Sequence, residues 1–288
     1  MKVFPLLFYG FYYCSSLTSV TIPDSVTFIG GSTFYGCSSL TSITIPKNVI
    51  SIHSGAFDNC FNLESVTFED TNGWRRQEEQ GDVGIEIDVT DKSKNAVYLR
   101  DFGVSSVSSS PLISFYKSVI TLNASNVASA ISKLPMGASC SIKIVGEMDT
   151  DILSDIRTAI KNNSTLRFSF DLSQTTGLTE IPDSAFSDCQ HCLTSVIIPD
   201  GVTSIGDSAF IGCISLTSVT IGDGVTSIGN YAFTACNSLT SIIFEDTSTW
   251  YYTSKDDYTG GTVIDVTDPT QNATYLKSTY YNKYWYKK

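Results

Sequence analysis

The heptapeptide Leu40-Thr41-Ser42-Ile43-Thr44-Ile45-Pro46 decides the fold of this chain, because near-identical copies of it recur at a fixed interval. Six leucines begin these copies, spaced 23 residues apart in two groups: Leu17, Leu40 and Leu63, then Leu193, Leu216 and Leu239. A partial copy begins at Leu178. A period of this length is typical of solenoids, in which each repeat packs only on its neighbours.

The pattern inside one repeat predicts a short strand followed by turns. Ile43 and Ile45 alternate with Ser42 and Thr44, as expected where one face of a strand is buried and the other is exposed. Further on, Ala56-Phe57-Asp58-Asn59-Cys60 is expected to form a short helical turn on the convex side. Since one repeat cannot bury its apolar side alone, the predicted fold class is an α/β solenoid of leucine-rich repeats of 23 residues with curved parallel sheets.

These motifs, L-T-S-[VI]-T-I-P, V-T-[SF]-I-G and A-F-x-x-C, closely resemble the BspA-like family of leucine-rich repeats, found in surface proteins of bacteria and of some protozoa. The resemblance covers residues 11–70 and 171–246, about half of the chain. It implies a cell-surface or secreted location, binding to host extracellular glycoproteins or other cells, and no catalytic residues. It is specific for the fold and much less so for the function.

A whole array together with its end piece is duplicated. Phe68-Glu69-Asp70-Thr71-Asn72-Gly73-Trp74 and Phe244-Glu245-Asp246-Thr247-Ser248-Thr249-Trp250 end the two arrays, and related sequences follow both. We interpret the end piece as a C-terminal β-cap over the open edge of the last repeat. The predicted segments are a first array with a truncated N-terminus (1–70), its C-terminal cap (71–104), a linker (105–111), an α/β N-terminal cap of array two (112–175), the second array (176–246) and its C-terminal cap (247–288).

The two ends of the chain leave alternatives open. The first thirteen residues, Met1 to Tyr13, look superficially like a secretory signal, but no small-residue cleavage site follows them. Phe11-Tyr12-Tyr13-Cys14 instead aligns with the repeat motif Phe34-Tyr35-Gly36-Cys37, so the first array is expected to lack an N-terminal cap. Either the chain is a fragment, or its first repeat is frayed, or that repeat packs against something else. At the other end, the aromatic segment Tyr280 to Tyr286 is expected to staple a terminal strand rather than to bind sugar.

Composition and charge argue against nucleic-acid binding and against a transmembrane helix. The 29 acidic residues outnumber the 18 basic ones and give a net charge of −11, with no clustered basic stretch to neutralise phosphates, so no nucleic-acid binding is expected. No run of about 18 apolar residues exists to form a transmembrane helix. The many Ser and Thr residues suit an exposed sheet.

The cysteines and histidines carry little sign of chemistry. Six of the eight cysteines share one repeat position and are expected to be free, inert, buried thiols: Cys14, Cys37, Cys60, Cys189, Cys213 and Cys236. Cys189-Gln190-His191-Cys192 resembles a redox pair or half of a metal site, but no second pair of ligands accompanies it, so no metal or cofactor is expected. His53 replaces a turn glycine and is expected to be exposed.

No motif with a catalytic mechanism is present, so we expect no enzyme. The leading hypothesis is a non-catalytic, surface-exposed, monomeric adhesion protein for a protein or glycoprotein partner, such as fibronectin, fibrinogen or another cell surface. The alternative is a structural spacer of a longer surface protein. The predicted partner-binding residues form the exposed sheet face: Ser195, Ile197, Ser218, Thr220, Ser241 and Ile243 in array two, with Ser42 and Thr44 in array one.

Overall fold

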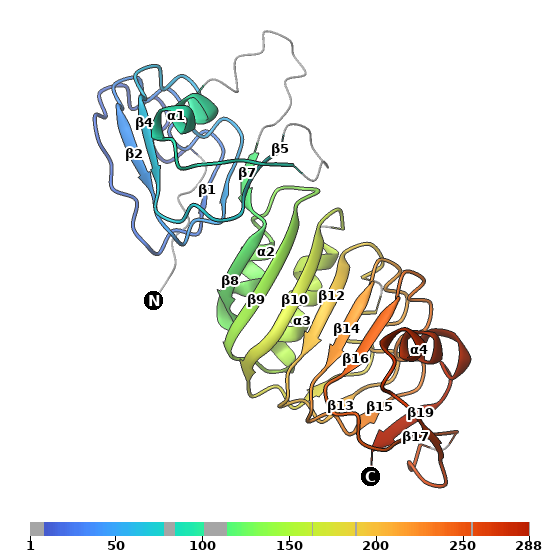
Figure 1. Ribbon diagram of the computed structural model, residues 1–288. Coiled ribbons are helices and arrows are strands. Elements are labelled where there is room, and N and C mark those ends of the chain that lie inside the picture. Colours follow the sequence, from blue (N-terminus) through green and yellow to red (C-terminus); the bar gives the residue numbers. More distant parts are fainter. Residues whose placement is uncertain are drawn as a thin grey trace. The chain divides into compact units, whose positions relative to one another are not determined.

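The chain forms two compact units, which are described separately (Figure 1). Unit one comprises Met1–Val119 and Lys133–Ser139, and unit two comprises Ile120–Ser132 and Cys140–Lys288. The computed structural model describes residues 9–77, 84–100, 114–162, 164–187, 189–254 and 256–287. The linker predicted at 105–111 lies outside these residues.

The larger sheet of unit two joins the repeats to the α/β module in front of them. Its strand order is β16-β14-β12-β10-β9-β8. The strands are β8 (Val119–Asn123), β9 (Ser139–Glu147), β10 (Arg167–Thr176), β12 (Leu193–Ile198), β14 (Ser218–Ile221) and β16 (Ser241–Phe244). The three repeat strands pair in parallel and in register, and β10 pairs in parallel with β12. Strand β10 of the module therefore pairs with the first long repeat strand of array two.

The helices of the module pack on the inner side of this sheet (Figure 1). They are α2 (Val127–Ile131), which follows a 3-10 turn at Ala124–Asn126, and α3 (Thr150–Lys161). Asp149 begins α3 by accepting a hydrogen bond from the Ile152 amide, at 2.8 Å. Because both helices lie on the buried side, the opposite face of the sheet carries none of them.

The smaller sheet of unit two combines short repeat strands with cap strands, in the order β11-β13-β15-β19-β17-β18. The strands are β11 (Glu180–Ile181), β13 (Ser204–Ile205), β15 (Ser227–Ile228), β17 (Trp250–Thr253), β18 (Thr262–Ile264) and β19 (Tyr284–Lys287). The terminal strand β19 pairs antiparallel with β15 and β17, and Trp285 within it is fully buried. The stapling interpretation of the aromatic C-terminus is therefore confirmed.

The core of each array consists of identical side chains stacked repeat on repeat. In array two, Phe186, Phe210 and Phe233 stack with ring centroids 5.1 and 5.0 Å apart. The Ala-Phe-x-x-Cys motif forms turns rather than the expected helical turn. The reason is that its amides bond between repeats: Phe210 N donates to Ala232 O of the next repeat, at 2.8 Å, and is not available for a helix.

Unit one repeats this design. Its strands are β1 (Phe28–Ile29), β2 (Ser42–Ile45), β3 (Ser51–Ile52), β4 (Ser65–Phe68), β5 (Trp74–Gln77), β6 (Ile85–Glu86) and β7 (Ser114–Lys117). They form a pair, β2-β4, and a sheet in the order β1-β3-β7-β5-β6. The first repeat, around Ser19 and Thr21, forms no strand. Strand β7 pairs with β3 and β5, so the boundary expected at residue 112 is wrong: Ser114–Lys117 completes the cap of array one.

The two end pieces contain strands, and each also contains a helix that the sequence pattern did not predict. In unit two the helix is α4 (Pro269–Thr274), continued by a π-helical turn, Tyr275–Thr279, and in unit one it is α1 (Lys92–Arg100). Asn272 Nδ2 donates to Ile242 O of the last strand, at 3.0 Å. Its counterpart Asn95 donates to Val66 O, at 3.1 Å. In each array, therefore, one asparagine side chain of the helix donates a hydrogen bond to the last repeat strand.

Candidate partner-binding face

The outward face of the larger sheet of unit two is the candidate partner-binding surface, and we call it the serine face. Strand alternation buries Val196 and Ile198 and turns Ser195 and Ile197 outward. Cross-strand pairing aligns two rows of predicted residues on this face: Ser195, Ser218 and Ser241, and beside them Ile197, Thr220 and Ile243. The structure therefore brings all six predicted residues of array two together.

The serine face extends beyond the repeats into the α/β module. Ser169 lies opposite Ser195, and Asp171 lies opposite Ile197. Ser169 Oγ donates to Ser141 Oγ at 2.9 Å, which carries the serine row onto β9. Sequence reasoning missed these residues because the module lacks the 23-residue period, although the alternation in Arg167–Thr176 was a usable signal.

The two rows of predicted residues on the serine face carry no charge, although the chain is strongly acidic. An ion pair on this face joins Lys143 Nζ and Asp171 Oδ2, at 3.7 Å. Partial burial raises the pKa of Asp171, but hydrogen bonds from Ser173 and the Lys143 ammonium outweigh it and hold that pKa below its usual range. Ile243 is 44% exposed and Ile197 is half-buried, so aliphatic side chains lie among hydroxyls. This mixture of apolar and hydroxyl groups suits contact with another macromolecule.

The two predicted residues of array one lie on a different and smaller sheet. Ser42 is opposite Ser65, and Thr44 is opposite Thr67, in the two-stranded pair β2-β4 of unit one. Both Ser42 and Thr44 are exposed. They form a face of their own within unit one and add no residue to the serine face of unit two.

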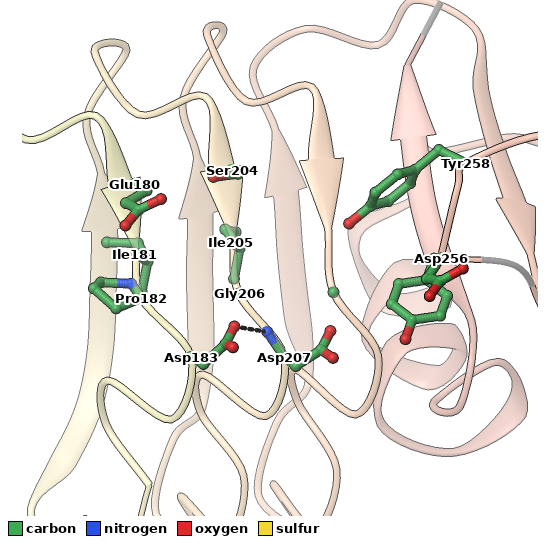
Figure 2. A pocket seen from close by; sticks show the side chains of 12 residues that line it. Glu180, Ile181, Pro182, Asp183, Ser204, Ile205, Gly206, Asp207, Asp256 and Tyr258 are labelled. Carbon is green, nitrogen blue, oxygen red and sulfur yellow. Dashed lines mark hydrogen bonds between the residues drawn. The ribbon is translucent and has the colours of Figure 1, made fainter.

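A groove of about 680 Å³ lies on the smaller sheet of unit two (Figure 2). Carboxylates line much of it, and sequence analysis had not singled them out because they occupy ordinary turn positions: Glu180, Asp183, Asp207 and Asp256. Tyr258 lies at one end, where burial, and next the charge of Asp207, raises the pKa of its hydroxyl. We call this hollow the acidic groove.

All eight cysteines are free thiols, as expected for the six at the repeat position, and seven of the eight are buried. Cys236 Sγ donates to Phe210 O at 3.1 Å, and burial raises the pKa of Cys60 and of Cys236 to about 12, which makes these thiols unreactive. Cys14 is exposed, so its predicted burial is wrong. No group of three or more His, Cys, Asp or Glu side chains within the described ranges is arranged to hold a metal ion.

His53 is half-buried, and the prediction of an exposed turn residue is wrong. Its Nε2 bonds to the carbonyl oxygen of Lys133, at 3.0 Å, because residues 133–139 cover this side of array one. Burial lowers the pKa of His53, and the hydrogen bond to that carbonyl opposes the effect only in part.

The fold and surfaces define a leucine-rich-repeat solenoid that presents an open sheet face. The family model described as "BspA type Leucine rich repeat region" matches six copies, over residues 7–76 and 162–282. The chain belongs to this family of leucine-rich-repeat proteins. None of the helices in the described ranges has the length and apolar character needed to span a bilayer.

Solved structures of bacterial leucine-rich-repeat proteins are similar to this chain at low identity. A leucine-rich cell surface protein from Faecalibacterium prausnitzii A2-165 is 23% identical, with a TM-score of 0.29, and the match covers 82% of this chain and 62% of that one. A protein from Bacteroides ovatus is 18% identical, with a TM-score of 0.22, over 82% of this chain and 74% of that one. Curated protein sequences give no match.

Proposed function

We propose that this protein is a non-catalytic adhesion protein of the cell surface and that the serine face of unit two binds its macromolecular partner. The observation that carries the proposal is the continuity of this face. Hydroxyl and aliphatic side chains lie side by side across β10, β12, β14 and β16, the bond from Ser169 to Ser141 continues the row onto β9, and helices α2 and α3 lie on the opposite side of the sheet (Figure 1). Solenoid sheets of this kind offer large partners an extended surface.

The chemistry of the face favours a protein or glycoprotein partner. Lys143 and Asp171 of this face pair with each other, and the two rows of predicted residues carry no charged side chain. Binding must then come from hydroxyl hydrogen bonds and from burial of Ile197 and Ile243. Extracellular matrix glycoproteins such as fibronectin or fibrinogen, and glycoproteins of another cell surface, are the candidate partners.

Surface plasmon resonance tests the proposal. The purified chain is passed over immobilised fibronectin, fibrinogen and a mucin, beside the double variant Ile197→Lys/Ile243→Lys. We expect saturable binding to one ligand and at least tenfold weaker binding by the variant, since roughly 1.4 kcal/mol corresponds to tenfold in affinity. A matched control is Ser42→Lys/Thr44→Lys on unit one.

Two results would count against the proposal. Equal binding by the folded Ile197→Lys/Ile243→Lys variant would remove the serine face from the site. Absence of binding to every ligand would favour the alternative, a spacer segment of a longer surface protein. The chain spans 62% of the Faecalibacterium prausnitzii protein that it matches.

A further inference from the structure

We propose that strand β8 (Val119–Asn123), at one end of the larger sheet of unit two, pairs antiparallel with β8 of a second copy of this chain. Figure 1 shows β8 as the outer strand of that sheet, and β9 is its one neighbour among the described strands. A strand can form backbone hydrogen bonds on both sides, so the outer side of β8 presents N–H and C=O groups to a further strand. Such pairing does not depend on the proposed function, and it would replace the monomer expected from the sequence with a dimer.

The sequence of β8 lacks the features that keep sheet edges apart. Proteins block their edges with charged side chains, with prolines or by making the end strands very short. Strand β8 has five residues, Val119-Ile120-Thr121-Leu122-Asn123, and contains neither a charged residue nor a proline. By contrast, the smaller sheet of unit two ends in β11 and β18, which have two and three residues. Strand β8 is therefore better suited to pairing than either end of the smaller sheet.

The opposite end of the larger sheet is closed, and this limits how two copies can combine. Helix α4 lies beside the last strand, β16, where Asn272 Nδ2 donates to Ile242 O at 3.0 Å. This helix blocks head-to-tail pairing of β8 with β16 of another copy, which would build an open filament. What remains is pairing of β8 with its own copy across a two-fold axis, and that assembly closes after two chains.

The side chains of β8 are compatible with this symmetry. In an antiparallel pair centred on Thr121, this residue lies opposite its own copy, and Ile120 lies opposite Leu122 of the second copy. Thr121 is exposed, whereas Ile120 and Leu122 are buried on the other side of the strand. Threonine pairs stabilise neighbouring strands, and no like charges meet here, although each copy carries a net charge of −11. The dimer would join two larger sheets and place their serine faces on one continuous sheet.

Analytical ultracentrifugation with a pair of charge variants tests this inference. The sedimentation mass of the full native chain should rise toward twice the mass of one chain between roughly 5 and 500 µM, because two five-residue strands make a small interface. Thr121→Lys and Thr121→Glu should each keep the mass of one chain, since like charges would then face each other across the axis. An equimolar mixture of the two variants should regain the mass of the dimer, since opposite charges then meet.

A matched control is Thr220→Lys on β14, a central strand of the same sheet, which should dimerise like the native chain. Thr121 is exposed, so its substitutions should leave the fold intact, which circular dichroism checks. A native chain that keeps the mass of one chain over the whole range would overturn the inference, and so would a mixture of the charge variants that stays monomeric. Dimers of Thr121→Lys alone would also overturn it, because the contact would then lie elsewhere. Protection of β8 amides from hydrogen exchange only in a complex with the macromolecular partner would assign this edge to a strand of that partner instead, which again contradicts the inference.

Discussion

The most stringent test of the cap helix α4 is to remove the side-chain amide of Asn272. Asn272 is fully buried, and its Nδ2 donates to Ile242 O at 3.0 Å and to Val266 O at 2.8 Å. Asn272→Ala leaves two buried carbonyls without this donor, at a cost of about 1–3 kcal/mol each. The Asn272 Oδ1 has no hydrogen-bond partner in the structure, so its removal returns about 1 kcal/mol. We therefore expect unit two to lose about 1–5 kcal/mol of stability.

Hydrogen exchange measured by mass spectrometry locates this loss. Amides of β16 should exchange at least roughly fivefold faster in Asn272→Ala, because the helix no longer holds the edge of that strand. Asn95→Ala should have the same effect on β4 in unit one, since Asn95 makes the same two kinds of bond. The exposed Asn237→Ala should change stability by less than about 0.5 kcal/mol. Unchanged exchange in β16 would refute the role we give to the cap helix.

Three further predictions follow from single positions. Gly224→Ala should destabilise unit two by about 1–3 kcal/mol in urea denaturation, because a Cβ at Gly224 would clash with the carbonyl oxygen of Asp200; unchanged stability would show that the turns do not stack this closely. Unit one should lose stability as pH falls below about 6.5, because burial lowers the pKa of His53 in the folded state and the unfolded chain takes up the proton first. Thermal denaturation between pH 7 and 5 should show the loss. His53→Gln should remove the part of the loss that comes from this histidine. With Ellman's reagent, Cys14 should react in the native chain and Cys60 should react only after denaturation; rapid native reaction of Cys60 would contradict its burial.

The repeats were the most predictable part of the molecule, and the reason is physical. A side chain at the same place in every repeat meets its own copy, so the alternation in Ser195–Ile198 sufficed to predict which groups face outward. The terminal strand Tyr284–Lys287 was predictable as a staple because aromatic residues favour strand pairing. Its counterpart Ser114–Lys117 was assigned to the wrong segment, since no repeat period marks it.

The features that sequence analysis missed depend on contacts between segments far apart in the chain. Helix α1 has a weakly amphipathic sequence, and its buried Asn95 bonds to the carbonyl oxygen of Val66 on the last strand of the array. The burial of His53 depends on Lys133, 80 residues away. The acidic groove collects turn residues such as Asp183 and Asp207, each unremarkable in its own repeat. The repeat period predicts the contacts that neighbouring repeats have in common, whereas helix α1, the burial of His53 and the acidic groove arise where the repetition ends.

The most direct test of the central claim is to map the partner's footprint on the chain. Hydrogen exchange would be compared for the free chain and for its complex with the matrix glycoprotein selected by surface plasmon resonance. The account predicts slower exchange in peptides that contain β12, β14 and β16, the strands that carry Ser195, Ser218 and Ser241, and no change in the smaller sheet of unit two. Protection elsewhere, with these three strands unchanged, would contradict the assignment of the serine face as the binding surface.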